Sequence, residues 1–379
     1  MRIAIVHHWF VTLGGGERVA EILAEMFPNA DIFTLVADDA QVPIGLHGRT
    51  LTTSFLQRIP GATKKHRYFL PLYPFAVEQL DLTSYDLVLT SDSGPMKGVI
   101  TNPNAVHICY CHSPMRYLWD GYYEYAASMP SLAKLPFMLA AHYVRNWDYI
   151  AAQRVTHFLA NSNYVAGRIQ HYYGRTSTVI HPPVDTQLGF IADAPQDYYL
   201  AAGRLVAYKK TEILIHACNH LGRRLRIVGT GPELNRLHSI AGPTIEFLGQ
   251  VNAKDLWQNY AHCRALLFAA DEDFGIVPLE AQACGRPVIA FEKGGALETV
   301  IGMAKNQPKG IATGVFYPQQ LSRSVEEAIQ EFERRETCFS PLSIQQHASR
   351  FDTTLFTKNI TNFIASVIPN ITMSMSSPQ

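Results

Sequence analysis

Two glutamates in the last third of the chain, Glu272 and Glu280, lie eight positions apart around a Gly and a Pro. The apolar run 265–270 before them predicts a buried strand, and Pro278 is typical of the first turn of a helix. This order of strand, loop and helix leaves the first N–H groups of the helix without acceptors, and such a helix start attracts phosphate. The pattern therefore fits a nucleotide diphosphate, with one carboxylate binding each flanking sugar.

Taken alone, the acid pair is more typical of an ordinary loop with two surface carboxylates. The longer string from Asp271 to Glu298, which includes Gly294 and Gly295, is more specific. It resembles the Glu-x7-Glu motif of retaining glycosyltransferases of family 4, which have the GT-B fold. The resemblance implies that Glu272 contacts the donor sugar and that Glu280 binds the ribose hydroxyls. The other donor contacts expected in this segment are Phe274, Gly275, Ile276 and Val277.

A glycine-rich loop, Gly14 to Gly16, follows the first predicted strand and opens a helix. Glycine lets the backbone approach an anion closely, although a flexible turn is also typical of such a loop. The loop lacks the G-x-G-x-x-G spacing of dinucleotide-binding proteins. In the family that the chain resembles, this loop faces the donor diphosphate and the acceptor, which places Gly15 and Gly16 at the donor.

A basic loop follows the predicted strand 197–203 and contains Arg204, Lys209 and Lys210. A guanidinium binds phosphate oxygens in pairs and an ammonium acts as a point charge, but a solvated surface loop has the same composition. The resemblance implies that Arg204 and Lys209 bind the diphosphate. The family often has Gly where this chain has Lys210, so the role of Lys210 stays open.

His112 ends the predicted strand 106–111 and enters a loop restricted by Pro114. A buried core histidine is one interpretation. The neighbouring His and Cys residues match no zinc spacing and alternate between the two faces of the strand, so they predict no metal site. In the family, the histidine of this loop lies beside the transferred sugar, and we therefore expect His112 and Glu272 to be catalytic.

The composition is that of a globular protein of 379 residues, with 47% hydrophobic and 17% charged residues. The formal net charge is zero, which gives no global argument for binding nucleic acid. The six Cys are scattered and predict reduced thiols in the cytoplasm. The N-terminus does not resemble a signal peptide, and no apolar run approaches the length of a membrane span.

Predicted strands and helices alternate along most of the chain, which favours an α/β fold with parallel sheets. The Pro-Pro segment after residue 180 cannot continue the centre of a sheet. We predict an acceptor-binding domain at 1–188 and a nucleotide-sugar-binding domain at 189–352. The resemblance implies two Rossmann-like domains facing across a cleft, with a C-terminal helix in 353–379 that crosses back to the first domain. The last residues, 372–379, are expected to fray.

A cluster of cations and aromatic rings lies at 64–75 and includes Lys64, Lys65 and Arg67. Cations suit anionic head groups, and aromatic rings suit the membrane boundary. A helix end followed by core residues is the alternative interpretation. The first interpretation predicts a cytoplasmic protein in peripheral contact with the inner face of the plasma membrane.

The resemblance implies transfer of a hexose from a nucleotide diphosphate sugar to a hydroxyl, with retention of configuration. We expect no cofactor and no metal, because Arg204, Lys209 and a helix start would supply enough positive charge. The strings 14–19, 111–117 and 272–278 resemble bacterial polysaccharide mannosyltransferases. GDP-mannose is therefore the first donor candidate, followed by UDP- and dTDP-sugars, and a lipid-linked glycan is the expected acceptor.

Two rival functions fit parts of the pattern. A nucleotide-sugar epimerase would convert its substrate without an acceptor. A non-catalytic nucleotide-sugar-binding subunit would need Arg204 and Lys209, but it would have little use for His112 together with both glutamates. A glycan phosphorylase of the same fold needs a lysine that holds pyridoxal phosphate, and the sequence shows no convincing one.

Overall fold

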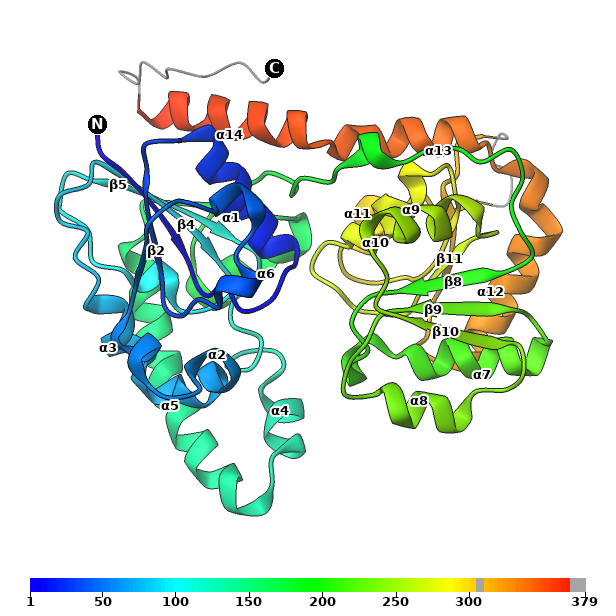
Figure 1. The fold of residues 1–379 in the computed structure, drawn as a ribbon, viewed down its shortest axis with the longest axis horizontal. Helices are drawn as coiled ribbons and strands as arrows, with labels where there is room; N and C mark the ends of the chain where they lie inside the picture. Colours follow the sequence, from blue (N-terminus) through cyan, green and yellow to red (C-terminus); the bar gives the residue numbers. More distant parts are fainter. Residues whose placement is uncertain (305–309, 369–379) are drawn as a thin grey trace. The chain divides into compact units, whose positions relative to one another are not determined.

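The alternation of strands and helices expected from the sequence is present in the computed structural model, which describes residues 1–304 and 310–368 (Figure 1). The chain forms two compact units, each built around one parallel sheet. Unit 1 contains residues 1–182 and the chain from Thr357 onward, and unit 2 contains residues 183–356. The expected frayed tail at 372–379 lies outside the described residues.

The sheet of unit 1 has seven parallel strands in the order β3-β2-β1-β4-β5-β6-β7. Its central strands are apolar on both faces because helices cover both sides of a parallel sheet. The strands are β1 (Ile3–His7), β2 (Asp31–Thr34), β3 (Leu51–Thr53), β4 (Leu87–Asp92), β5 (Val106–Cys111), β6 (His157–Ala160) and β7 (Ser177–Val179).

The helices of unit 1 differ widely in length, from one turn in α2 to 24 residues in α5. Helix α6 shows how local sequence sets the ends, because the Ser162 hydroxyl accepts from the Val165 N–H and Gly174 closes the helix in the left-handed conformation. The helices are α1 (Gly15–Met26), α2 (Ala62–Lys65), the 3-10 helix η4 (His66–Leu72), α3 (Tyr73–Glu78), the 3-10 helix η5 (Met96–Gly98), α4 (Tyr122–Ser128), α5 (Ser131–Arg154) and α6 (Asn163–Tyr173).

Unit 2 repeats the plan with six parallel strands in the order β10-β9-β8-β11-β12-β13. The strands are β8 (Tyr199–Ala202), β9 (Leu225–Val228), β10 (Ile245–Gly249), β11 (Leu266–Phe268), β12 (Val288–Phe291) and β13 (Gly314–Tyr317). The helices are the 3-10 helix η7 (Ala207–Lys209), α7 (Thr211–Leu221), α8 (Leu234–Ile240), α9 (Ala253–His262), α10 (Ile276–Ala283), α11 (Ala296–Thr299), α12 (Ser322–Arg335) and α13 (Pro341–Ala348).

The unit boundaries lie a few residues from the predicted ones. Contacts separate the units after Pro182 and again before Thr357, whereas the sequence predicts 188 and 352. The difference has a local cause: the Thr186 hydroxyl donates to Asp352 Oδ2 at 2.6 Å, and the Val184 N–H donates to the Phe351 carbonyl at 3.1 Å. These bonds attach the segment after Pro182 to unit 2. The last helix, α14 (Thr353–Val367), therefore begins in unit 2 and continues in unit 1.

Candidate active site

In unit 2, the predicted basic loop and the predicted acidic loop meet. Arg204 and Lys209 follow β8, and Glu272 follows the adjacent strand β11. Lys209 Nζ lies 2.9 Å from Glu272 Oε1, and both side chains are mostly buried. Burial acts to lower the pKa of Lys209, but the Glu272 carboxylate outweighs it and raises that pKa above its ordinary value. Lys209 is therefore a fixed cation at the carboxyl end of the sheet.

Arg204 differs from Lys209 because its side chain is exposed and makes no hydrogen bond or ion pair with any residue that the structure describes. Both cations line a solvent-open pocket whose empty space, open solvent included, is about 340 Å³. Gly203 directly precedes Arg204 and has φ +129°, and a Cβ there would lie 2.8 Å from Lys209 Nζ. The pocket thus offers one paired and one unpaired cation to an anion, over backbone that leaves room for it.

Glu280 is the fifth residue of α10 and binds a partner of its own. Its Oε2 accepts a hydrogen bond from the Tyr260 hydroxyl at 2.7 Å. Burial raises the pKa of Glu280 above its ordinary value, partly opposed by the Tyr260 hydrogen bond. Glu272 and Glu280 therefore do not form a pair in the structure. Each carboxylate has its own partner, which agrees with the expectation that they contact different parts of a donor. Tyr260 is a site residue that the sequence does not reveal.

The start of α10 has the geometry expected for anion binding. Gly275 is the N-cap with φ +100°, and the helix begins at Ile276. The N–H groups of Ile276 and Val277 belong to the first turn, where no intrahelical acceptor exists. Phe274 is buried against the core of unit 2, so in this loop the backbone, rather than the Phe274 side chain, can face a ligand.

Lys210 adopts the left-handed conformation with φ 52°, which makes it the one non-glycine residue with positive φ among residues 1–304 and 310–368. A side chain raises the energy of this conformation, whereas glycine adopts it freely. The Gly that the related family often has at this position is explained by the backbone, and the side chain of Lys210 need not contact a ligand.

In unit 1, the glycine-rich loop meets His112. Gly15 is the first residue of α1, and Gly16 follows it. A Cβ on Gly16 would lie 3.6 Å from His112 Nε2 and 3.6 Å from His7 Cε1. The start of α1 and the carboxyl ends of β1 and β5 therefore converge, and the glycine lets them approach.

Ser91 holds His112 in this position. The Ser91 Oγ atom and His112 Nε2 are hydrogen-bonded at 2.8 Å, and His7 Nδ1 lies 2.9 Å from the Ser91 carbonyl oxygen. Burial, together with the nearby His8, lowers the pKa of His112 to about 3, although Asp92 acts in the opposite direction. Burial likewise lowers the pKa of His8 to about 4. The histidines are thus neutral near pH 7 and can donate or accept hydrogen bonds without carrying charge.

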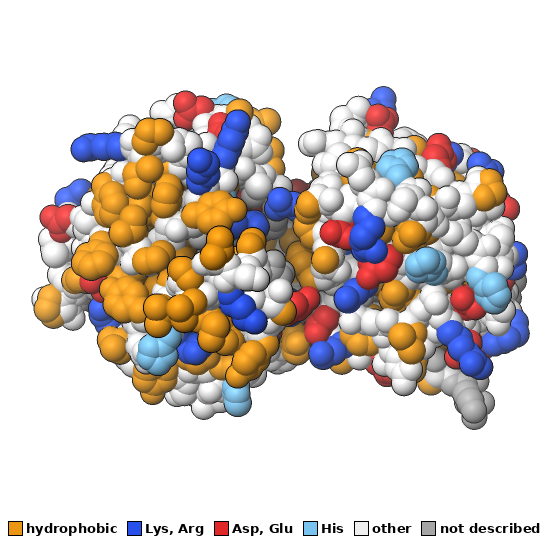
Figure 2. Space-filling model, turned by 90° about the horizontal axis from the view of Figure 1, so that it is seen from below, with side chains coloured by type: hydrophobic (Ala, Val, Ile, Leu, Met, Phe, Trp, Pro, Cys, Tyr) orange, Lys and Arg blue, Asp and Glu red, His pale blue; other side chains and the backbone are white. Residues whose placement is uncertain are grey.

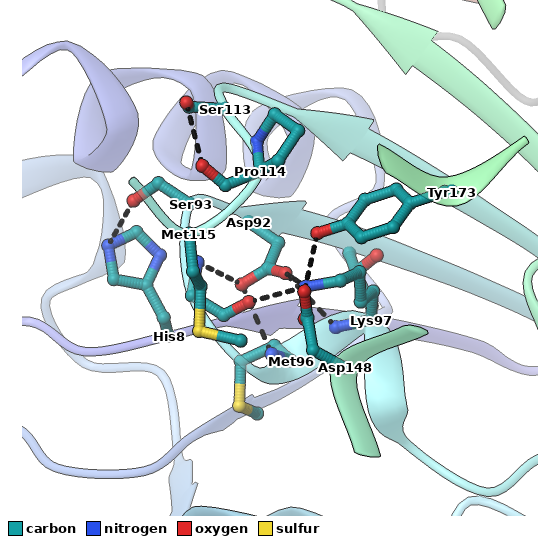
Figure 3. Close-up of polar contacts among 12 residues, drawn as sticks. His8, Asp92, Ser93, Met96, Lys97, Ser113, Pro114, Met115, Asp148 and Tyr173 are labelled. Atoms are coloured by element: carbon teal, nitrogen blue, oxygen red, sulfur yellow. Dashed lines mark hydrogen bonds and ion pairs between the residues drawn. The ribbon is translucent and has the colours of Figure 1, made fainter. Parts of the chain in front are cut away.

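A buried ionic network supports the loop that follows β4 (Figure 3). Lys97 bonds to the Gly94 carbonyl at 2.8 Å and pairs with Asp92 and Asp148, and all three charged side chains are almost fully buried. Tyr173 also donates to Asp148 at 2.8 Å. Asp148 belongs to α5, whereas Asp92 ends β4, so the network connects α5 to the strand that carries Ser91.

The predicted site residues are divided between the two units. Gly15, Gly16 and His112 lie in unit 1, and the donor-binding residues from Arg204 to Glu280 lie in unit 2. Within the described residues, no group of three or more His, Cys, Asp or Glu side chains is arranged to hold a metal ion. His7, Ser91 and Tyr260 are additions to the predicted set. His7 and Ser91 lie in β1 and β4 near their carboxyl ends, which is where ligands bind in such sheets.

Two family models match most of the chain. Residues 13–188 match the model described as Glycosyltransferase Family 4, and residues 191–340 match the model described as Glycosyl transferases group 1. These matches cover both sets of site residues, the glycine-rich loop with His112 and the loops with Arg204, Lys209 and Glu272.

Named relatives are similar over parts of the chain. A D-inositol 3-phosphate glycosyltransferase of Streptomyces bingchenggensis is 33% identical over 36% of this chain and 38% of its own. A GDP-mannose-dependent alpha-(1-6)-phosphatidylinositol monomannoside mannosyltransferase of Mycolicibacterium smegmatis is 31% identical over 37% of this chain and 45% of its own. The alpha-1,3/1,6-mannosyltransferase ALG2 of Saccharomyces cerevisiae is 23% identical over 82% of this chain and 72% of its own. The chain thus spans less than half the length of the first two relatives.

Solved structures are similar over nearly the whole chain. HepE of Anabaena in complex with UDP has a TM-score of 0.70 at 19% identity and covers 97% of this chain and 100% of its own. Sucrose-phosphate synthase of Thermosynechococcus elongatus has a TM-score of 0.71 at 17% identity and covers 98% of this chain and 100% of its own. At these identities the likeness shows the fold. The two family models, the fold and the positions of the motifs agree, and this chain belongs to glycosyltransferase family 4 and has the GT-B fold.

Proposed function

We propose that the protein is a retaining hexosyltransferase that moves mannose from GDP-mannose to a hydroxyl of a lipid-linked or oligosaccharide acceptor. The observation that supports it best is the Lys209–Glu272 ion pair beside Arg204, which is exposed. One cation bound to a carboxylate and a second, exposed cation suit a donor that carries a diphosphate next to a sugar.

The chemical task is to break the bond between the sugar and the diphosphate. Negative charge grows on the leaving diphosphate, and Arg204, Lys209 and the N–H groups at the start of α10 would stabilise it. These groups make a divalent metal unnecessary in the proposal. Glu272 would bind the sugar hydroxyls and stabilise positive charge at the anomeric carbon. Because Glu272 is paired with Lys209, this ion pair would orient both the carboxylate that binds the sugar and the ammonium that binds the phosphate.

The remaining predicted residues have more limited roles. Glu280 would bind the ribose hydroxyls, with Tyr260 fixing its carboxylate. His112 would contact the sugar or the leaving group as a neutral imidazole, since burial lowers its pKa to about 3. Gly15 and Gly16 would leave room for donor or acceptor at the start of α1.

The choice of donor rests on relatives. The names of the Mycolicibacterium smegmatis and Corynebacterium glutamicum relatives state GDP-mannose as the donor, and ALG2 is named a mannosyltransferase. A UDP-sugar is the second candidate, because HepE of Anabaena is similar over 97% of this chain and its structures hold UDP and UDP-glucose.

The acceptor and its location are also proposals. Phosphatidylinositol monomannoside in the names of two relatives is a lipid acceptor. None of the helices in the described part of the chain is both long and apolar enough to cross a bilayer. A lipid-linked acceptor would bring the chain to the inner face of the membrane, where the exposed Lys64, Lys65 and Arg67 would face anionic head groups.

Thermal unfolding with GDP-mannose, UDP-glucose and dTDP-sugars tests the donor, because a ligand that binds only the folded chain raises the melting temperature. We expect a rise with GDP-mannose and none with the others. A rise with UDP-glucose alone would replace the first donor by the second. Nuclear magnetic resonance of the glycoside product would then give the anomeric configuration, and inversion would contradict the proposed mechanism.

A further inference from the structure

Helix α5 of unit 1 is apolar on two opposite faces. Its inner face contains Phe137, Ala141 and Val144, which pack into the core of unit 1. Its outer face contains Leu132, Leu135, Leu139 and Tyr143, which are 95%, 64%, 66% and 45% exposed.

Steps of three and four residues place these outer side chains on one stripe of the helix. A soluble helix normally carries polar residues on the face that points away from its core. The outer face of α5 therefore remains to be covered by something outside the unit.

Neighbouring elements extend this apolar surface. η4 packs against α5, and the rings of Tyr68 and Phe75 are 81% and 63% exposed. Tyr123 of α4 is also largely exposed. Figure 2 shows hydrophobic side chains gathered over this side of unit 1, with Lys and Arg side chains among and around them. The apolar area is thus one continuous region formed by η4, α3, α4 and α5, which we call the α5 surface.

The charges of the α5 surface are mostly positive, although Glu78 ends α3 and Glu124 lies on α4. Residues 55–77 and 125–147 contain no Asp or Glu. Their cations are Arg58, Lys64, Lys65, Arg67, Lys134 and Arg145. All of these except Arg145, which is partly buried and donates to the Leu118 carbonyl, are exposed. Glu124, on α4, is the nearest exposed acid before the second segment.

We propose that the α5 surface docks on an anionic lipid bilayer, with the outer face of α5 in the interfacial layer and the cations on lipid phosphates. Exposed Leu and Tyr side chains suit the boundary between head groups and acyl chains, and each nearby cation adds attraction to anionic lipid. This inference extends the proposed function, since it supplies the contact that a lipid-linked acceptor requires.

The charge pattern favours a bilayer over a second copy of the chain. In a symmetric dimer the same patch meets itself, so one mostly positive surface would face another. A lipid surface has a negative potential and no such conflict.

Flotation of the full chain with two kinds of vesicle tests the proposal: phosphatidylglycerol mixed with phosphatidylcholine, and phosphatidylcholine alone. We expect the chain to float with the anionic vesicles only. Neutralising three surface cations, as in Lys64→Gln, Lys65→Gln and Arg67→Gln combined, should weaken binding by about 100-fold. Leu132→Ser, Leu135→Ser and Leu139→Ser combined should weaken it at least about tenfold, because three apolar side chains no longer enter the interface.

The matched control is an equally polar change on unit 2. Leu321, Leu342 and Leu355 are also exposed, and their combined replacement by Ser should leave flotation unchanged. Equal flotation of the α5 variant and the unchanged chain would overturn the proposal. So would self-association in sedimentation experiments that the α5 variant abolishes, because the occupant would then be a second copy.

A second readout separates this inference from the proposed function. All variants should retain the melting-temperature rise with nucleotide sugar, since none of these residues lies in the donor site. Flotation by a chain that responds to no nucleotide sugar would uphold the docking surface and contradict the proposed function. A chain that responds to nucleotide sugar but never floats would uphold the proposed function and contradict the docking surface.

Discussion

The candidate site residues of unit 1 and those of unit 2 differ in their electrostatic character. In unit 1 the side chains that contact His112, those of Ser91 and His7, are buried and uncharged, and the nearby Asp92 is paired with Lys97. In unit 2 the polar groups are charged, and Arg204 is exposed to solvent. The two sets of residues come from similar parallel sheets, so the difference lies in the loops and not in the architecture.

The difference suggests that the two sets of residues bind different parts of the substrate. A neutral, preorganised group loses little on binding an uncharged sugar, because no ion has to give up water. Exposed cations suit a diphosphate, whose charge they neutralise. The residues of each unit thus suit the part of the substrate that the family motif assigns to them. Substitutions in unit 1 and in unit 2 should therefore impair different properties.

The largest effect is expected for Glu272→Ala. The rate of sugar transfer should fall by about 100- to 1,000-fold, since a charge that stabilises the transition state is lost. Binding of the nucleoside diphosphate should persist, because Lys209 is released from its ion pair. Transfer rates and calorimetric affinities measure the two effects. Glu327→Ala, which removes an exposed carboxylate of α12 in unit 2, is the control. Normal transfer by the Glu272 variant would exclude this residue from catalysis.

Arg204→Ala and Lys209→Ala should each weaken nucleoside diphosphate binding by about 10- to 100-fold, as expected for a lost charged hydrogen bond. They should differ in stability. Arg204 has no partner among the described residues, so its loss should leave the melting temperature unchanged. The loss of Lys209 leaves Glu272 mostly buried without its partner, and should lower the melting temperature. Identical melting temperatures for the two variants would contradict the difference in pairing.

Acidification should destabilise unit 1 before unit 2. Burial lowers the pKa of His8 from 6.5 to about 4, so below pH 6.5 the unfolded chain binds the proton first. The free energy of unfolding should then fall by about 1.4 kcal/mol per pH unit for each such histidine until the folded pKa is reached. The raised pKa of Glu280 acts with the opposite sign in unit 2, because the folded form holds that proton more tightly.

Hydrogen exchange read separately for peptides of the two units measures this asymmetry. Exchange between pH 6.5 and 5 should accelerate more in residues 1–182 than in residues 183–356, where burial lowers the pKa of a single described histidine, His347. Faster exchange in unit 2 over the same range would show that the buried histidines do not control acid stability.

The smallest effect is expected for Ser91→Ala. Ser91 is a positioning residue, so its loss should cost about one hydrogen bond, or a five- to tenfold lower rate, with the KM for the donor unchanged. Ser91→Thr keeps the hydroxyl and should restore most of the rate. Failure of the Thr variant to do so would indicate that the Ala variant acts through packing.

The sequence was most informative where chemical groups are close together along the chain. Arg204 and Lys209 share one loop, and Glu272 and Glu280 flank one helix start, so a local pattern contains the information. Their meeting across β8 and β11 follows from strand adjacency, which general rules for parallel sheets provide.

The residues that sequence reasoning missed are isolated polar groups on separate elements. Ser91 stands inside the run of β4, and His7 ends β1, so nothing in the local pattern connects them to His112. Tyr260 resembles any buried tyrosine of an amphipathic helix. Helix α5 was not predicted because both of its faces are apolar, which removes the single stripe that indicates a helix. The strand β13 was also missed, and it is only four residues long.

The Asp92–Lys97–Asp148 network has a mechanical consequence. A displacement of α5 by one helical turn would separate Asp148 from Lys97 and leave uncompensated charges in the core, which costs about 3–5 kcal/mol. The network is therefore a rigid spacer that holds α5 at a constant height relative to the end of β4. If the outer face of α5 rests on a bilayer, this spacer sets the depth at which Ser91 and His112 stand above the lipid.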